Sequence, residues 1–285
     1  MENPEYLEHS PTLKRKKTIV LLLFFICFMI WPPASYSSTV FNESVNDTLT
    51  VITYNIHHGR GIDGKINPQR IADVINQSGS DIAALQEVDI NTSRSGNIDL
   101  LKILSDKTGL KYTSFGLNLE FEGGEYGNAI LSRYPLENIK NHHFKNISGE
   151  QRGVLTAVID IYGEDILLVN THLDHTENND SERVLYAEKI RDMIIPCSDE
   201  HAVIMAGDLN DGPDSDTYHI INRRLKDAWI SAGSGDGFTI PVQNPERRID
   251  YIFYSGNIKP VHAETIQTEA SDHLPVVVKF MYLND

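Results

Sequence analysis

The chain has 285 residues and a formal charge of −15, which allows one large domain or two small ones. Such an acidic chain has no overall electrostatic attraction to nucleic acid or to an anionic membrane surface. The charge therefore disfavours a general DNA-binding protein, although a local cationic cleft stays open. An acidic excess also suits a site that gathers carboxylates around a divalent cation.

The first 37 residues differ in kind from the rest. A basic segment, Lys14–Lys17, precedes an apolar run from Ile19 to Trp31, and a small, polar stretch follows. This order is typical of a secretory signal, and the run is short for a bilayer span, which needs about 20 apolar residues. Because no clean cleavage site follows, an uncleaved membrane anchor over residues 18–31 stays open. Both alternatives predict export, to a secreted, periplasmic or membrane-tethered location.

Residues 38–48 are polar and predict a linker, so the main folded domain is expected at residues 49–285. Residues 1–37 carry four basic and three acidic residues, which leaves the remainder with a formal charge of −16. Cys27 lies in the apolar run, so the exported part retains Cys197 alone. It can form no internal disulfide and lacks the paired cysteines of a zinc site, so the fold must depend on its apolar core.

Short apolar runs alternate with helical patterns along the domain. Asn67-Pro68 predicts the start of a helix that ends at Gly79, the leucine-rich segment 100–104 predicts a second that ends at Gly109, and Ser181-Glu182 opens a third. Runs rich in Val, Ile and Thr predict strands at 49–54, 82–85, 128–132, 154–161, 166–169, 203–206, 249–254 and 275–280. The neighbouring strands at 128–161 and 249–280 argue against a purely parallel sheet.

Four of the predicted strands end in polar residues, and two further polar sets flank later strands. The side chains concerned are Asn55, Glu87, His172, Asp208, Asn210, Asp250, Asp272 and His273. If these ends share one rim, the clustered carboxylates require a cation or shifted pKa values. Oxygen ligands favour magnesium, manganese or calcium over zinc. A hard cation beside histidines is suited to phosphoester hydrolysis.

Seven motifs occur in a fixed order along residues 49–280. They are Thr53-Tyr54-Asn55, Leu85-Gln86-Glu87, Gly127–Ser132, Asn170–Leu173, Gly207–Asn210, Arg248–Tyr251 and Ser271-Asp272-His273. Together they are similar to the motifs of the endonuclease/exonuclease/phosphatase superfamily, which includes the DNase I-like nucleases. The resemblance implies an α+β fold: a four-layer αββα sandwich of two mixed sheets flanked by helices, with the site at one edge.

The resemblance also implies ligands and substrate contacts. Glu87 and Asp272 are expected to hold Mg²⁺ or Mn²⁺, with Asn55 beside them. Arg152 and Asn128 are expected to contact the substrate.

The catalytic roles follow from the same resemblance. Asp208 and Asn210 are expected to position the attacking water and the phosphate. His273, oriented by Asp250, is expected to act as a base or as an electrostatic partner. His172 is expected to bind the phosphoryl oxygens or to assist the leaving group.

Two other patterns are interpreted as secondary to the site. Adjacent strand residues face opposite ways, so the pairs His57-His58 and His142-His143 are expected to be rim or surface histidines that do not share one ion. His57 remains a candidate for substrate contact. The run from Gly59 to Gly64 fits a dinucleotide-binding pattern, but the next helix begins only after it, so a loop near the site is expected.

The sequence thus predicts an exported, metal-dependent hydrolase of a phosphodiester or phosphomonoester, with a lipid or inositol phosphate head group among the candidates. A metal-dependent nuclease is the alternative within enzymes, and a catalytically silent binding module on the same fold is the alternative outside them. Membrane association through the N-terminus is expected to be compatible with either enzyme, and no obligate protein partner is inferred. Specificity resides in loops, so the sequence does not identify the substrate.

Overall fold

The computed structural model of the chain describes residues 48–145, 147, 149–161, 163–198 and 201–283. The chain divides into two units, Met1–Glu43 and Ser44–Asp285, and every described residue belongs to the second. The predicted signal or anchor segment lies outside the described residues, as does the predicted linker except for Thr48, which opens the first strand. Among the described helices, none is long and apolar enough to cross a membrane.

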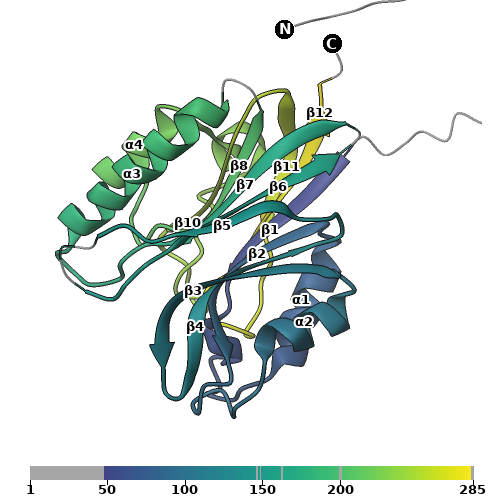
Figure 1. Ribbon diagram of the computed structural model, residues 1–285, viewed down its shortest axis with the longest axis vertical. Helices are drawn as coiled ribbons and strands as arrows, with labels where there is room; N and C mark the ends of the chain where they lie inside the picture. The colour runs from purple at the N-terminus through teal and green to yellow at the C-terminus, as the bar shows by residue number, and fades with distance from the viewer. Residues whose placement is uncertain (1–47, 146, 148, 162, 199–200, 284–285) are drawn as a thin grey trace, which may run out of the picture. The chain divides into compact units, whose positions relative to one another are not determined.

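Two six-stranded sheets form the centre of the described unit (Figure 1). The first has the order β11-β12-β1-β2-β4-β3 and contains β1 (Thr48–Asn55), β2 (Ile82–Ile90), β3 (Tyr112–Phe121), β4 (Gly124–Ser132), β11 (Ile258–Thr265) and β12 (Val276–Tyr282). The second has the order β5-β6-β7-β8-β10-β9 and contains β5 (Glu137–His142), β6 (Val154–Ile161), β7 (Glu164–His172), β8 (Ala202–Asp208), β9 (Lys226–Asp227) and β10 (Asp250–Ser255). In each sheet one pair is parallel, β1 with β2 and β7 with β8, and the other pairs are antiparallel.

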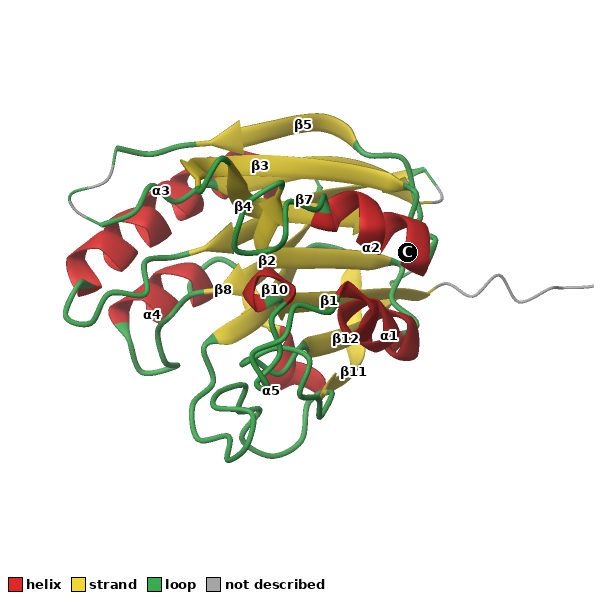
Figure 2. Cartoon of the chain, turned by 90° about the horizontal axis from the view of Figure 1, so that it is seen from below, coloured by secondary structure: helices red, strands yellow, loops and turns green. Residues whose placement is uncertain are grey.

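Helices cover the outer faces of the two sheets. The described helices are η1 (His57–Gly59), α1 (Pro68–Ser78), α2 (Leu100–Thr108), α3 (Asp180–Ser198), α4 (Asp216–Asn222) and α5 (Ala228–Ala232). Figure 2 shows α1 and α2 on one side of the strands and α3 and α4 on the other. One apolar cluster lies between the sheets, a second joins α1 and α2 to the first sheet, and a third joins α3 and α4 to the second sheet. The predicted αββα sandwich of mixed sheets is confirmed.

Local sequence signals explain the helix boundaries on the first sheet. Asn67 Oδ1 accepts a hydrogen bond from the backbone of Gln69 at 3.1 Å, and α1 ends at Gly79 with φ 63°. Asp99 Oδ1 caps α2 in the same way through Lys102 N at 2.9 Å, and α2 ends at Gly109. An acceptor side chain at the start and glycine in the left-handed region at the end satisfy backbone groups that the helix leaves unpaired.

The sequence pattern predicts none of β3, β5, β9, β11, α4 and α5. β5 is a mostly exposed edge strand with a polar sequence, Glu137–His142, so it carries no alternation of apolar residues. β3 and β11 are held by pairing with β4 and β12, which are themselves partly apolar strands. Such elements owe their conformation to their neighbours, because pairing outweighs weak intrinsic β-propensity.

A buried side-chain amide joins the two sheets next to the predicted rim. Asn170 on β7 is fully buried, and its Nδ2 donates to the carbonyls of Leu85 and Ala129 in the first sheet, both at 2.9 Å. Its Oδ1 accepts from Gln86 Nε2 at 2.7 Å, and the same Nε2 reaches Thr53 Oγ1 at 3.2 Å. These bonds determine the position of β7 along β2. They therefore align the strand ends of the second sheet with those of the first.

We predict that Asn170→Ala lowers the free energy of unfolding by about 2–4 kcal/mol, because it removes three buried hydrogen bonds between the sheets, two to carbonyls and one from Gln86. Urea denaturation should show a lower midpoint with an unchanged slope. Asn76→Ala is the matched control, since its exposed amide makes one 3.3 Å bond to the Lys107 carbonyl. Equal midpoints for the two variants would contradict the proposed importance of the amide.

Candidate active site

The carboxyl ends of the two parallel strand pairs meet at one edge of the sandwich. In the first sheet Asn55 is in register with Gln86, and in the second His172 is in register with Asp208. Asn55 Nδ2 lies 3.1 Å from Asp208 Oδ2, so the two sheets are joined at this edge by a direct hydrogen bond. The polar strand ends form one rim.

Asn55 connects the two carboxylates of this rim. Its Nδ2 donates to Glu87 Oε1 and to Asp208 Oδ2, both at 3.1 Å, and its Oδ1 accepts from His57 N at 3.1 Å. Asn210 N donates to Asp208 Oδ1 at 2.8 Å. Because its Nδ2, and not its oxygen, faces both carboxylates, Asn55 is placed as a support for Glu87 and Asp208. Its expected part as a direct metal ligand stays a prediction that this geometry does not favour.

The two carboxylates have different proton affinities. Burial raises the pKa of Asp208 to about 7, and the neighbouring Asp250 adds to the shift. Burial also opposes ionisation of Glu87, but the adjacent His58 and Asn55 outweigh it and hold the pKa of Glu87 well below its usual range. Near neutral pH Glu87 is therefore ionised, whereas Asp208 can take up and release a proton.

Several residues of the site have left-handed backbone conformations. The angle φ is 57° at Glu87, 51° at Asn210, 44° at His57 and 45° at His58. Such a conformation costs an L-residue about 1–2 kcal/mol, and less for Asn. At Glu87 the pairing of β2 with β4 is interrupted by a bulge, which turns a side chain away from the regular alternation. Strain of this kind persists where surrounding contacts hold it and is common at functional sites.

His273 is paired with Asp250 and faces Asp208. Its Nδ1 lies 2.9 Å from Asp250 Oδ2, and its Nε2 lies 3.8 Å from Asp208 Oδ2. Burial disfavours the charged ring, but the two carboxylates raise the pKa of His273 to about 10. Of the two expected roles, the geometry therefore favours an imidazolium that acts as an electrostatic partner over a neutral base.

His172 is buried beside Arg152, and both burial and Arg152 lower its pKa. Arg152 Nη1 lies 3.3 Å from His172 Nδ1, and a guanidinium can only donate, so Nδ1 must accept. Burial, with Arg152 next, holds the pKa of His172 well below its usual value. The ring is therefore neutral. Its Nε2 lies 3.0 Å from Asn210 Nδ2 and 3.6 Å from Asp208 Oδ2.

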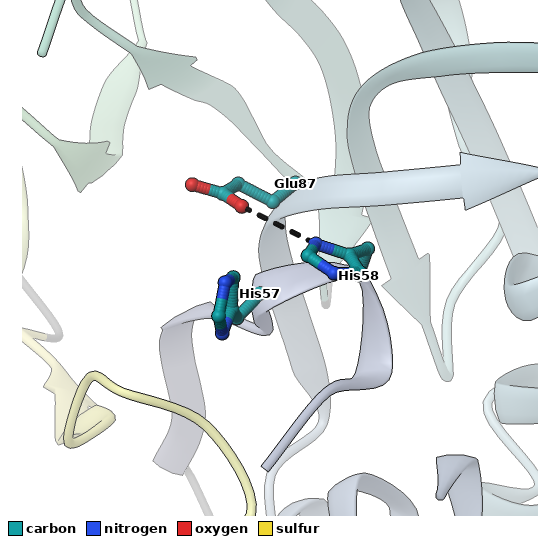
Figure 3. A group of neighbouring side chains, drawn as sticks. All are labelled: His57, His58 and Glu87. Carbon is teal, nitrogen blue, oxygen red and sulfur yellow. Dashed lines mark ion pairs between the residues drawn. The ribbon is translucent and has the colours of Figure 1, made fainter. Parts of the chain in front are cut away.

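The prediction that His57 and His58 are strand residues with side chains facing opposite ways is wrong. Both lie in η1, directly after β1, and not in a strand. With both residues left-handed, the two rings lie beside Glu87, as Figure 3 shows, and their centroids are 4.5 Å apart. His58 is only 6% exposed and so is not a surface residue. Asp272 lies on the other side of His57, with Oδ1 3.6 Å from His57 Nδ1.

Two groups of side chains within the described residues have donor atoms close enough to share a cation. One is Asp208, Asp250 and His273; the other is His57, His58 and Glu87. The negative charge of the first group is already compensated, because the His273 imidazolium lies between the two carboxylates. The second keeps an ionised carboxylate beside uncommitted ring nitrogens, so its donors fit a divalent cation.

A cavity of about 270 Å³ opens beside this second group. Its lining comprises His57, His58, Glu87, Arg94, Leu119, Phe121, Tyr126, Glu150, Arg152, His175 and Asp272. Three of the predicted residues, Glu87, Asp272 and Arg152, face this cavity. Asn128 does not line it: the side chain is fully buried and donates to the Gly153 carbonyl at 3.1 Å. Asn128 thus supports the Arg152 segment, and its expected substrate contact is not favoured by this geometry.

The part of the cavity wall formed by Arg94, Phe121 and Tyr126 is not predicted from the sequence. Arg94 forms two 2.8 Å bonds to the fully buried Asp89, and its guanidinium lies 4.5 Å from the Phe121 ring centroid and 5.2 Å from that of Tyr126. These residues come from β2, the loop after it and the β3–β4 hairpin. The hairpin signal was available in Glu122-Gly123-Gly124 between two aromatic residues, but nothing local indicates that it borders the site.

We predict that Asp250→Asn lowers the pKa of His273 in the metal-free protein, because it removes the carboxylate bonded to Nδ1. The folded-state value of about 10 exceeds the unfolded value of about 6.5. The stabilisation from this pair is therefore complete below about pH 6.5 and is lost as pH rises through about 10. NMR titration of the ring should show the shift, with the exposed Asp214→Asn as control. An unchanged His273 pKa in Asp250→Asn would refute the pairing.

Known proteins share this fold. An endonuclease/exonuclease/phosphatase from Beutenbergia cavernae superposes with a TM-score of 0.71 at 24% identity, over 82% of this chain and 72% of that one. A mannosyl-6-phosphatase from Bacteroides thetaiotaomicron superposes with a TM-score of 0.66 at 18% identity, over 82% of this chain and 100% of that one. At such identities the likeness shows the fold alone.

Sequence relatives extend the comparison. The uncharacterized protein YbhP of Escherichia coli strain K12 is 27% identical over 241 residues, which is 79% of this chain and 93% of that protein. Protein cwh43 of Schizosaccharomyces pombe is 28% identical over 162 residues, which is 57% of this chain and 16% of that protein. The model of the Endonuclease/Exonuclease/phosphatase family matches residues 52–273. Because that match spans most of the chain, the protein belongs to the endonuclease/exonuclease/phosphatase family.

Proposed function

We propose that this protein is an exported, divalent-metal-dependent phosphoesterase that hydrolyses compact phosphoester head groups. The observation that carries the proposal is the bonded set of Glu87, Asn55 and Asp208 across the two sheets. Enzymes of this family act on phosphoester bonds. Export is supported by the sequence pattern of the first 37 residues.

Glu87 and Asp272 would hold the cation, with Asn55 keeping Glu87 in place. Glu87 is ionised and borders the cavity, and Asp272 borders it from the segment before β12. A bound divalent cation neutralises charge on the phosphoryl group and lowers the pKa of bound water.

The remaining residues supply proton transfer and hydrogen bonds. Asp208, with a pKa of about 7, can accept the proton that water loses as its oxygen bonds to phosphorus. The imidazolium of His273 can donate to the phosphoryl oxygens, where negative charge develops. His172, which borders Asp208 at the same rim, would bind the phosphoryl oxygens or assist the leaving group. The ester P–O bond breaks, and the leaving oxygen takes a proton from solvent.

The cavity favours a small substrate. It has a volume of about 270 Å³, and both of its arginines are already engaged, Arg94 by Asp89 and Arg152 by Glu150. With Glu150 in the wall and an acidic chain around it, the opening offers little attraction to a long polyanion. A sugar phosphatase among the structural neighbours also supports a phosphorylated sugar or polyol, as a free molecule or as a head group.

We predict that EDTA abolishes hydrolysis of bis-nitrophenyl phosphate or inositol phosphates and that Mg²⁺ or Mn²⁺ restores it. Asp208→Asn should lower kcat by about 100-fold or more without loss of folding, because it removes the proton acceptor. Asp214→Asn, a surface change of the same kind, should leave kcat unchanged. Full activity in a verified metal-free preparation would end the proposal, and an inactive wild type on every phosphoester tried would favour a silent binding module.

We predict that kcat/KM for a compact phosphoester equals or exceeds that for duplex DNA at physiological salt. The comparison is made across a salt series, because each phosphate contacted on DNA steepens the dependence on salt concentration. A strong preference for DNA with a steep log–log slope would instead identify a nuclease.

A further inference from the structure

Two histidines extend the expected oxygen ligands of the metal. We propose that His57 and His58 join Glu87 in a nitrogen-containing metal site, so that this protein prefers an imidazole-binding transition-metal ion such as Zn²⁺ over Mg²⁺. The inference rests on the proposed function in that the ion would be the one at Glu87. Imidazole suits first-row transition metals, whereas Mg²⁺ prefers an all-oxygen environment with several waters.

The three donor atoms already lie close to one another. One ligand atom from each of His57, His58 and Glu87 lies within 4.8 Å of the others, and His58 Nδ1 is 3.9 Å from Glu87 Oε2. Ligand atoms about 2.1 Å from a common ion lie about 3.0–3.4 Å apart. Small side-chain rotations therefore suffice to close the site. The rings meet at an interplanar angle of 72°, so they approach from different directions and do not stack (Figure 3).

The ring nitrogens lack other partners among the described residues. Nδ1 of His57 and Nδ1 of His58 are both buried and accept or donate no hydrogen bond, and His58 as a whole is only 6% exposed. A buried polar atom without a partner is uncommon and costly. In contrast, His172, His175 and His273 have ring nitrogens bonded to Arg152 or to Asp250. A cation at Glu87 would satisfy both free nitrogens at once.

The backbone makes the convergence possible. Because His57, His58 and Gly59 all have positive φ, consecutive side chains do not alternate and both rings face Glu87. Asp272 Oδ1 lies 3.6 Å from His57 Nδ1. Two imidazoles and one carboxylate, from His57, His58 and Glu87, form a nitrogen–oxygen set of the kind that zinc accepts. The adjoining cavity leaves the site open to substrate.

The test uses the full chain, stripped with EDTA and desalted, and titrated by calorimetry with Zn²⁺ and separately with Mg²⁺. The informative variant is His57→Asn with His58→Asn, because Asn tolerates the left-handed backbone but removes both imidazoles. We expect the wild type to bind one Zn²⁺ more tightly than Mg²⁺ and the double variant to lose at least about tenfold in Zn²⁺ affinity, with Mg²⁺ affinity unchanged. Pulsed EPR of the Cu²⁺-loaded protein should show imidazole nitrogen couplings that the variant lacks.

The other adjacent pair provides the matched control, because His142→Asn with His143→Asn removes two histidines from β5 and the residue after it. It should bind Zn²⁺ as the wild type does. Equal Zn²⁺ affinity in the wild type and in His57→Asn/His58→Asn, or no preference for Zn²⁺ over Mg²⁺, would overturn the proposal and leave the histidines as ion-pair partners of Asp272 and Glu87. Zn²⁺ binding through both histidines without phosphoester hydrolysis would refute the proposed function alone. Unchanged Mg²⁺-supported hydrolysis together with unchanged Zn²⁺ binding in the variant would refute only this inference.

Discussion

The hydrogen bonds of the Asn170 amide are the constraint on which the site depends. Apolar side chains between two sheets attract without direction, so they do not define how far one sheet slides along the other. Asn170 removes that freedom, because its amide must meet two carbonyls of the first sheet and Gln86 at the same time. The residue after Gln86 is Glu87, and the second residue after Asn170 is His172. Alignment of the two buried amides therefore also aligns Glu87 and His172, the candidate site residues that follow them in the chain.

Charge is the second constraint. Asp208 and Asp250 are buried together, and two such carboxylates are not both ionised without compensation. His273 lies between them and supplies one positive charge. The pKa of Asp208 is raised to about 7. On the other side of Asn55, Glu87 has no guanidinium or ammonium partner among the described contacts, only histidines. This asymmetry places a carboxyl group with a pKa of about 7 on one half of the rim and an ionised carboxylate on the other half.

Backbone strain gathers at the same rim. Glu87 in its bulge, Asn210 after β8 and the two histidines after β1 all have positive φ. None of these residues is a glycine, so each conformation is held by its surroundings: Glu87 by the Asn55 amide, Asn210 by Asp208 and the Leu173 carbonyl. Regular strands bring the chain to the rim, and these irregular positions turn the side chains toward a common point.

The sequence by itself determined the family, the αββα architecture and the strand ends that carry the site, because these depend on local signals such as Asn67-Pro68 and on short motifs in a fixed order. It also indicated Glu87, Asp208 and His273 as candidate site residues. Only the tertiary structure decided which of them touch, the contacts of His172, the burial of Asn128 and the cavity wall formed by Arg94 and Phe121. The alternation expected of strand residues misplaced His57 and His58, because left-handed backbone angles follow from contacts with residues distant in the chain and not from local pattern.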